Sequence, residues 1–255
     1  MDELFGYVSG IMARGAAIGR DPRARRTAAI GLAVATSIAA GNGIGQLTAA
    51  GQQRAVAIVA AADSASWRGV PEDSVTDEQR ARQYVSSWRL DLRRTPIRLL
   101  DAWLARPEAW RDELVPILEA HSVPPEFLYL ALLESGMDPA AESPAAAVGL
   151  WQFTEPTARQ YGLVVEDGVD ERLDWRRSTW AAGRYLRDLY DLFGTWELAA
   201  AAYNGGPGRV SRALETTGLD SYWALVEAGH LPRETSDYVP KFLAIVDLAE
   251  ERILQ

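Results

Sequence analysis

Glu134 is the residue whose surroundings most clearly suggest chemistry. It follows Leu132 and Leu133 in the apolar stretch YLALLESGMDP, which covers residues 129–139. Burial in such a stretch, at the C-terminal end of a predicted helix, disfavours the carboxylate and raises its pKa. A carboxyl group that stays protonated near neutral pH can serve as a general acid. An isolated glutamate is usually turned to solvent, so Glu134 is either a surface residue or a proton donor.

Polar motifs at fixed distances after Glu134 favour the second interpretation. Ser135 follows directly, and Ser143 lies nine residues after Glu134. The motif GLWQ ends at Gln152, eighteen residues after Glu134. The motif AYN ends at Asn204, and the segment LPRETSDYVPKFLA occupies residues 231–244.

Other kinds of catalytic centre find little support in the composition. The chain has no cysteine, so thiol nucleophiles, disulfides and thiolate metal sites are excluded. His121 and His230 are the two histidines, and they lack the spacing of known metal motifs. We therefore expect no metal and no cofactor.

Charge is divided unevenly along the chain. Residues 1–26 carry five arginines and three acids, whereas residues 54–255 carry 21 basic and 32 acidic residues, a net charge of −11. Nucleic-acid binding requires clustered Lys and Arg, so nucleic acid is not an expected partner.

The N-terminal region has the composition of an export signal. Basic residues end at Arg26 and are followed by an apolar run of 13 residues at 28–40 and then by small residues. We assign residues 1–50 to a signal peptide or an N-terminal membrane anchor, with inner-membrane association through residues 28–50. The protein is then expected in the periplasm or cell envelope.

Helical periodicity dominates the rest of the chain, and no convincing strand pattern or internal repeat is present. Residues 51–76 are interpreted as a linker, residues 164–177 as an acidic, arginine-rich loop, and Asp77 and Ser178 as N-caps of helices. The fold class is predicted to be all-α. Helices are expected near residues 77–90, 97–104, 110–120, 125–135, 156–161, 179–193, 196–204 and 236–254.

Taken in order, the motifs resemble those of the goose-lysozyme-like lytic transglycosylases, especially the soluble and the membrane-bound D-type enzymes of bacterial cell walls. That family has an ES dipeptide, a serine nine residues after the glutamate, GLxQ, AYN and a later ET…YV segment. The resemblance covers about residues 111–243. It implies a lysozyme-like, goose-type catalytic domain at 106–255, preceded by a linker and helical extension at 51–105.

The resemblance implies cleavage of the β-1,4 bond between N-acetylmuramic acid and N-acetylglucosamine in peptidoglycan glycan strands. Glu134 would protonate the leaving oxygen and then accept the proton of the C6 hydroxyl, which closes as a 1,6-anhydro sugar. Because the substrate supplies the nucleophile, the second carboxylate of ordinary glycosidases is not needed. Substrate-binding roles are implied for Ser143, Gln152, Tyr203, Asn204, Glu234 and Tyr238, with Tyr203 packed beside the acid.

Three departures from the family pattern affect loops. Ala146 stands where a glycine is usual, so we expect the loop to turn there without a positive φ. The usual proline is displaced by one position, to Pro156, and Trp175 replaces a residue that is often proline.

Alternatives remain for several residues and for the activity itself. Tyr203 could be an ordinary core tyrosine, Ser135 a helix-end cap, and Trp151 a groove wall or a platform for a sugar ring. A water-using muramidase with Asp138 or Glu142 as base is the competing enzyme. A non-catalytic wall-binding scaffold on the same fold is the competing class.

Overall fold

A computed structural model describes residues 75–253. The predicted targeting segment at 1–50 and nearly all of the predicted linker lie outside the described residues. Within residues 75–253, no helix is both long enough and apolar enough to cross a membrane.

Helices account for almost all of the regular structure in this part of the chain, so the predicted all-α class is confirmed. The helices are α4 (Asp77–Leu92), α5 (Ile97–Leu104), α6 (Arg111–Ala120), α7 (Leu128–Ser135), α8 (Glu155–Gln160), α9 (Trp175–Phe193), α10 (Trp196–Gly205), α11 (Pro207–Thr217), α12 (Tyr222–Glu227) and α13 (Arg233–Ile253), with short 3₁₀ turns η1 (Pro107–Trp110) and η2 (Pro125–Phe127). Strands β1 (Val165–Glu166) and β2 (Val169–Asp170) form a small antiparallel hairpin in which Val165 pairs with Asp170.

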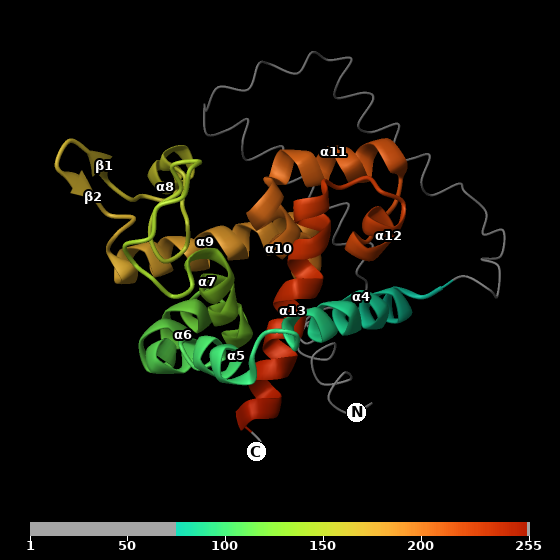
Figure 1. Ribbon diagram of the computed structural model, residues 1–255. Helices are drawn as coiled ribbons and strands as arrows, with labels where there is room; N and C mark the ends of the chain where they lie inside the picture. Colours follow the sequence, from blue (N-terminus) through green and yellow to red (C-terminus); the bar gives the residue numbers. More distant parts are fainter. Residues whose placement is uncertain (1–74, 254–255) are drawn as a thin grey trace, which may run out of the picture.

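Helix α13 runs through the centre of the molecule, and helices α4, α5, α7 and α10 pack against it (Figure 1). Helix α4 crosses one side of α13, while α10 lies between α13 and α9. Helices α6 and α7 pack together below α9, and the β1–β2 hairpin projects beyond α8 at the edge of the fold. Residues from both ends of the described chain therefore meet at α13.

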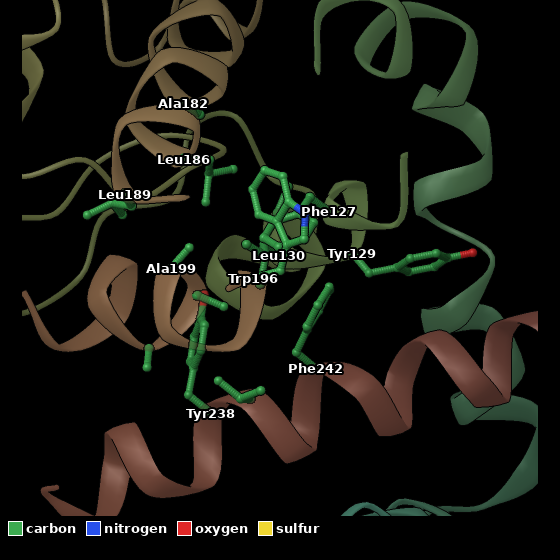
Figure 2. Packing of buried hydrophobic residues seen from close by; sticks show 14 of the residues in the cluster. Phe127, Tyr129, Leu130, Ala182, Leu186, Leu189, Trp196, Ala199, Tyr238 and Phe242 are labelled. Carbon is green, nitrogen blue, oxygen red and sulfur yellow. The ribbon is translucent and has the colours of Figure 1, made fainter. Parts of the chain in front are cut away.

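The core explains why the run before Glu134 is so apolar. All side chains from Leu128 to Leu132 are buried, so α7 is covered on every face by other elements. Phe127 lies 4.8 Å from Trp196 of α10 and 5.3 Å from Phe242 of α13, measured between ring centroids. Figure 2 shows Phe127, Leu130, Trp196 and Phe242 in the same part of the core. This packing fixes the direction in which α7 delivers Glu134.

Two predicted N-caps are wrong, one by a single residue and the other by four. Helix α4 is capped by Thr76, whose hydroxyl accepts a hydrogen bond from the Gln79 N–H while the Gln79 side chain accepts one from the Thr76 N–H. Helix α9 is capped by Asp174, whose carboxylate accepts hydrogen bonds from the N–H groups of Arg176 and Arg177. Asp174 thus satisfies two free N–H groups of the first turn, whereas Ser178 is buried inside the helix.

The C-terminal half contains more helix than the sequence pattern indicated. Helix α11 begins directly after Gly206, whose φ of 85° turns the chain, and Pro207 occupies the first helical position. Helix α12 follows it, and the final helix begins at Arg233 instead of residue 236. The predicted loop at 164–177 also contains the β1–β2 hairpin.

Candidate active site

Glu134 lies in the last turn of α7. The helix stops there because Gly136 adopts a left-handed conformation, with φ of 65°, and its N–H donates back to the Ala131 and Leu132 carbonyls. The Glu134 side chain is half-buried, and its Oε1 accepts a hydrogen bond from the hydroxyl of Tyr238 on α13. The acid therefore projects from the end of one buried helix toward another.

Burial raises the pKa of Glu134 to about 7. The Tyr238 hydrogen bond opposes this effect because it favours the carboxylate, whereas the negative charge of Glu234 raises the pKa further. Near neutral pH, this carboxyl group can therefore both hold and release a proton.

Ser135 connects the end of α7 to the GLWQ segment. Its hydroxyl lies 3.0 Å from the Ala131 carbonyl oxygen and 2.9 Å from the Leu150 carbonyl oxygen, and it accepts a hydrogen bond from the Asp138 N–H at 3.2 Å. The Ser135 hydroxyl thus forms hydrogen bonds to backbone groups at the end of α7, and it also links this helix to the later loop that contains Leu150.

The loop of residues 141–153, here called the 141–153 loop, carries Ser143 and Gln152. The Ser143 hydroxyl accepts a hydrogen bond from the Ala147 N–H at 3.0 Å. The Gln152 side-chain amide donates to the carbonyls of Ala141 at 3.2 Å and Gly149 at 2.9 Å. Both polar side chains therefore shape the loop, and both remain partly exposed.

The expectation that the loop turns without a positive φ at Ala146 is wrong. Ala146 has φ of 59° and Gln152 has φ of 50°, so two non-glycine residues adopt the left-handed conformation in this loop. A hydrogen bond from the Ala146 N–H to the Ser143 carbonyl, 2.9 Å long, closes the turn. The Ala146 carbonyl in turn accepts a hydrogen bond from Arg172 at 3.1 Å. These contacts hold a conformation that alanine alone disfavours.

Trp151 belongs to the core, so both sequence-based interpretations of it, groove wall and sugar platform, are wrong. Its side chain is fully buried, and its indole N–H donates to the Thr179 hydroxyl at 2.8 Å.

Tyr203 of α10 also bonds to this segment, because its hydroxyl donates to the Trp151 carbonyl at 2.8 Å. Tyr203 lies near enough to Glu134 for that charge to contribute to its raised pKa, of which burial is the main cause. The hydroxyl that donates to Glu134 nevertheless comes from Tyr238.

Asn204 and Glu234 meet where α10 approaches α13. The Asn204 side-chain oxygen accepts from the Thr235 hydroxyl at 3.0 Å, and its amide donates to Glu234 at 3.3 Å. A Cβ on Gly205 would lie 2.7 Å from the Thr235 hydroxyl oxygen, so the two helices can approach this closely only with glycine there. Glu234 is exposed and available to solutes.

The acids that could act as a second carboxylate face solvent. Asp138 is exposed and accepts a hydrogen bond from the Ala140 N–H at 2.9 Å, as a turn residue does. Glu142 is exposed, and Glu155 pairs with Arg159 at 3.0 Å. Among residues 75–253, no cluster of three or more His, Asp or Glu side chains could hold a metal ion.

Sequence reasoning missed Arg172, which is buried beside the 141–153 loop. The sequence predicts only an acidic, arginine-rich loop at residues 164–177, without a role for this arginine. The available signal was its spacing: Arg172 lies two residues after Asp170 and two before Asp174, so an ion pair with a neighbouring carboxylate could have been expected.

Comparison with known proteins agrees with the motifs of the sequence. Residues 117–226 match the family described as "Transglycosylase SLT domain". This part of the chain is similar to the SLT domain. The resemblance noted from the motifs, to lytic transglycosylases with this domain, is thereby confirmed.

Individual proteins agree with this similarity. Membrane-bound lytic murein transglycosylase D of Escherichia coli K12 is 38% identical over 148 residues, which cover 56% of this chain and 32% of that protein. Soluble lytic murein transglycosylase of the same strain is 30% identical over 146 residues, covering 54% of this chain and 22% of that protein. The chain thus spans about a third or less of the length of these two relatives.

A solved structure supports the lysozyme-like fold. The complex of the 70-kDa soluble lytic transglycosylase with bulgecin A superimposes with a TM-score of 0.52 at 26% identity, covering 71% of this chain and 31% of that one. The predicted goose-type, lysozyme-like architecture is confirmed by this likeness.

Proposed function

We propose that the SLT domain is a peptidoglycan lytic transglycosylase that cleaves the bond between N-acetylmuramic acid and N-acetylglucosamine and leaves 1,6-anhydro ends. The observation that carries the proposal is the position of Glu134, half-buried, hydrogen-bonded by Tyr238 and with a pKa raised to about 7. The names of the relatives, lytic murein transglycosylases, support the same substrate and reaction.

In the first step, protonated Glu134 gives its proton to the glycosidic oxygen as the bond from that oxygen to C1 breaks. A pKa near the working pH suits this transfer, because the acid is populated and its proton is readily given up. The Tyr238 hydroxyl can then stabilise the carboxylate that forms, since it already donates to Oε1.

In the second step, the Glu134 carboxylate accepts the proton of the C6 hydroxyl while that oxygen bonds to C1. The proton lost in the first step is thereby recovered, and no water is consumed. Asp138 and Glu142 are both exposed, and the acid whose charge raises the pKa of Glu134 is Glu234, which supports this route over hydrolysis with either of them as base.

The remaining site residues are proposed to bind the glycan strand. Ser143 and Gln152 lie on the 141–153 loop, and Asn204 and Glu234 form an exposed hydrogen-bonded pair at the α10–α13 approach. Tyr203 is proposed to fix the loop beside the acid through the Trp151 carbonyl.

A location in the cell envelope accords with relatives named membrane-bound and soluble murein transglycosylases. We propose that residues 1–50 direct export or anchoring, with inner-membrane association through residues 28–50, and that residues 106–255 form the catalytic unit.

Product analysis of purified peptidoglycan digests tests the reaction. Wild-type protein should release muropeptides with anhydro ends, which are lighter by one water than reducing ends. Glu134→Gln should lower the rate at least a thousandfold, since it removes the only proton donor proposed.

Two matched variants serve as controls. Glu119→Gln, which changes an exposed acid on α6, should keep full activity. Asp138→Asn should do so too if no base for water is needed. Reducing ends, or loss of activity in Asp138→Asn, would identify a muramidase instead.

A further inference from the structure

Arg172 links the segment after the β1–β2 hairpin to the 141–153 loop. Only 8% of the residue is exposed, although it carries a full charge. One guanidinium nitrogen, Nη1, donates to the Ala146 carbonyl at 3.1 Å and to the Phe153 carbonyl at 3.2 Å. A single buried side chain thus holds the loop at two places, Ala146 in its middle and Phe153 at its end.

Asp170 neutralises the buried charge and orients the guanidinium. Arg172 Nε lies 2.9 Å from Asp170 Oδ1, and Nη2 lies 2.6 Å from Oδ2. The Arg172 N–H also donates to Oδ1 at 3.0 Å. The planar fork of arginine can serve a carboxylate with one edge and two carbonyls with the other, which an ammonium group cannot do with the same geometry.

The two carbonyls that Arg172 holds are next to strained backbone. Ala146 itself has φ of 59°, and Phe153 follows Gln152, which has φ of 50°. Each left-handed non-glycine residue costs on the order of 1 kcal/mol, so the loop needs contacts that favour this conformation over others. Within the described residues, Arg172 bonds to the loop at both of these places.

We propose that Arg172 is a positioning residue for substrate, which fixes the 141–153 loop so that Ser143 and Gln152 face the glycan strand. The inference rests on the proposed function, because it assigns a role in binding that same substrate. Arg172 contacts neither Glu134 nor Tyr238, so it should act on substrate affinity and leave the protonation of the acid unchanged.

Kinetics on solubilised glycan strands, well below the melting temperature of each variant, test the proposal. Arg172→Gln should raise KM about tenfold or more, with a smaller fall in kcat and an unshifted pH profile. Arg172→Lys keeps the charge facing Asp170 but not the fork, and should give an intermediate KM even if Arg172→Gln folds poorly. Arg177→Gln is the matched control, because Arg177 is exposed and pairs with Glu171 at 2.6 Å.

A second substitution separates positioning from general stability. Ala146→Gly removes the cost of the left-handed conformation at one end of the loop, so Arg172→Gln should raise KM less in the Ala146→Gly background than in the wild type. A lower melting temperature with KM within twofold of wild type would overturn the proposal, as would a shifted pH profile or equal effects in the two backgrounds.

Product analysis of the wild type accompanies these measurements. If the wild type releases no anhydro muropeptides, the proposed function fails. If it does release them and the KM values do not change, only the role of Arg172 fails.

Discussion

At the scale of single residues, the protonation of Glu134 depends on two opposing influences. Burial favours the neutral acid, and the Tyr238 hydroxyl favours the carboxylate. The resulting pKa of about 7 predicts that kcat/KM falls as pH rises through neutrality, because a free enzyme with ionised Glu134 has no proton to donate.

Tyr238→Phe should move this alkaline fall to higher pH. The substitution removes the hydrogen bond that lowers the pKa of Glu134 and leaves burial in place, so the pKa should rise, by about one unit. The maximal rate should fall as well, because the carboxylate formed in the first step loses its donor. A pH–rate profile of kcat/KM measures both effects.

Tyr203→Phe is the matched control for this shift. Its hydroxyl donates to the Trp151 carbonyl and not to Glu134, so the alkaline limb should stay where it is in the wild type. A profile that moves with Tyr203→Phe but not with Tyr238→Phe would show that the wrong tyrosine has been assigned to the acid.

At the scale of elements, the 141–153 loop and the segment after the β1–β2 hairpin are packed backbone against backbone. Gly149 has φ of 85°, and a Cβ there would lie 2.0 Å from the Arg172 carbonyl oxygen. The contact lies within backbone, which cannot move aside as a flexible side chain can.

Gly149→Ala should therefore separate the two segments and impair both stability and activity. We expect the melting temperature to fall by several degrees, corresponding to about 2 kcal/mol or more, and kcat/KM to fall at least tenfold. Gly168→Ala is the matched control: its φ of 82° imposes the same backbone strain, but a Cβ there meets no atom within 4 Å. Equal losses in the two variants would show that the φ, not the close approach, matters.

The motifs of these elements could be predicted from sequence because they depend on local spacing. The apolar run before Glu134 identified a buried helix, and the intervals to Ser143 and Gln152 identified the family. The left-handed conformation of Ala146 could not be predicted from an alanine, because one of the hydrogen bonds at this turn comes from Arg172, which is distant in sequence. The burial of Trp151 likewise depends on Thr179 of α9, and a sequence pattern does not show which face of a loop meets another helix.

At the scale of the whole molecule, the site is completed by helices outside the matched SLT region. The match ends at residue 226, yet Tyr238 comes from α13. Helix α4, which precedes the match, packs along α13: Lys241 lies over the Trp88 ring at 5.5 Å, and Arg89 pairs with buried Asp247 at 3.2 Å. The helical extension thus supports the helix that holds the hydroxyl bonded to the acid.

The Arg89–Asp247 pair makes this support dependent on pH. Burial raises the pKa of Asp247 to about 6, and Arg89 limits the rise. Without Arg89 the pKa of Asp247 should rise further. Between the pKa of the unfolded state and that of the folded state, the folded protein holds a proton that the unfolded chain has lost. The free energy of unfolding therefore decreases as the pH rises through this range, and in the variant the range extends to a higher pH than in the wild type.

Arg89→Met should therefore lower the melting temperature more at pH 8 than at pH 5. The additional loss in the free energy of unfolding is about 2 kcal/mol, which corresponds to roughly 4–8 °C in melting temperature. Arg94→Met, which removes an exposed arginine paired with Asp91, should change it little at either pH. Adding Asp247→Asn to Arg89→Met should remove the extra loss at pH 8, because no buried carboxyl group remains at 247 to titrate. Thermal unfolding of the wild type and the three variants at pH 5 and pH 8 measures these effects. If Arg89→Met lost the same stability at both pH values, Arg89 would stabilise α13 by packing alone.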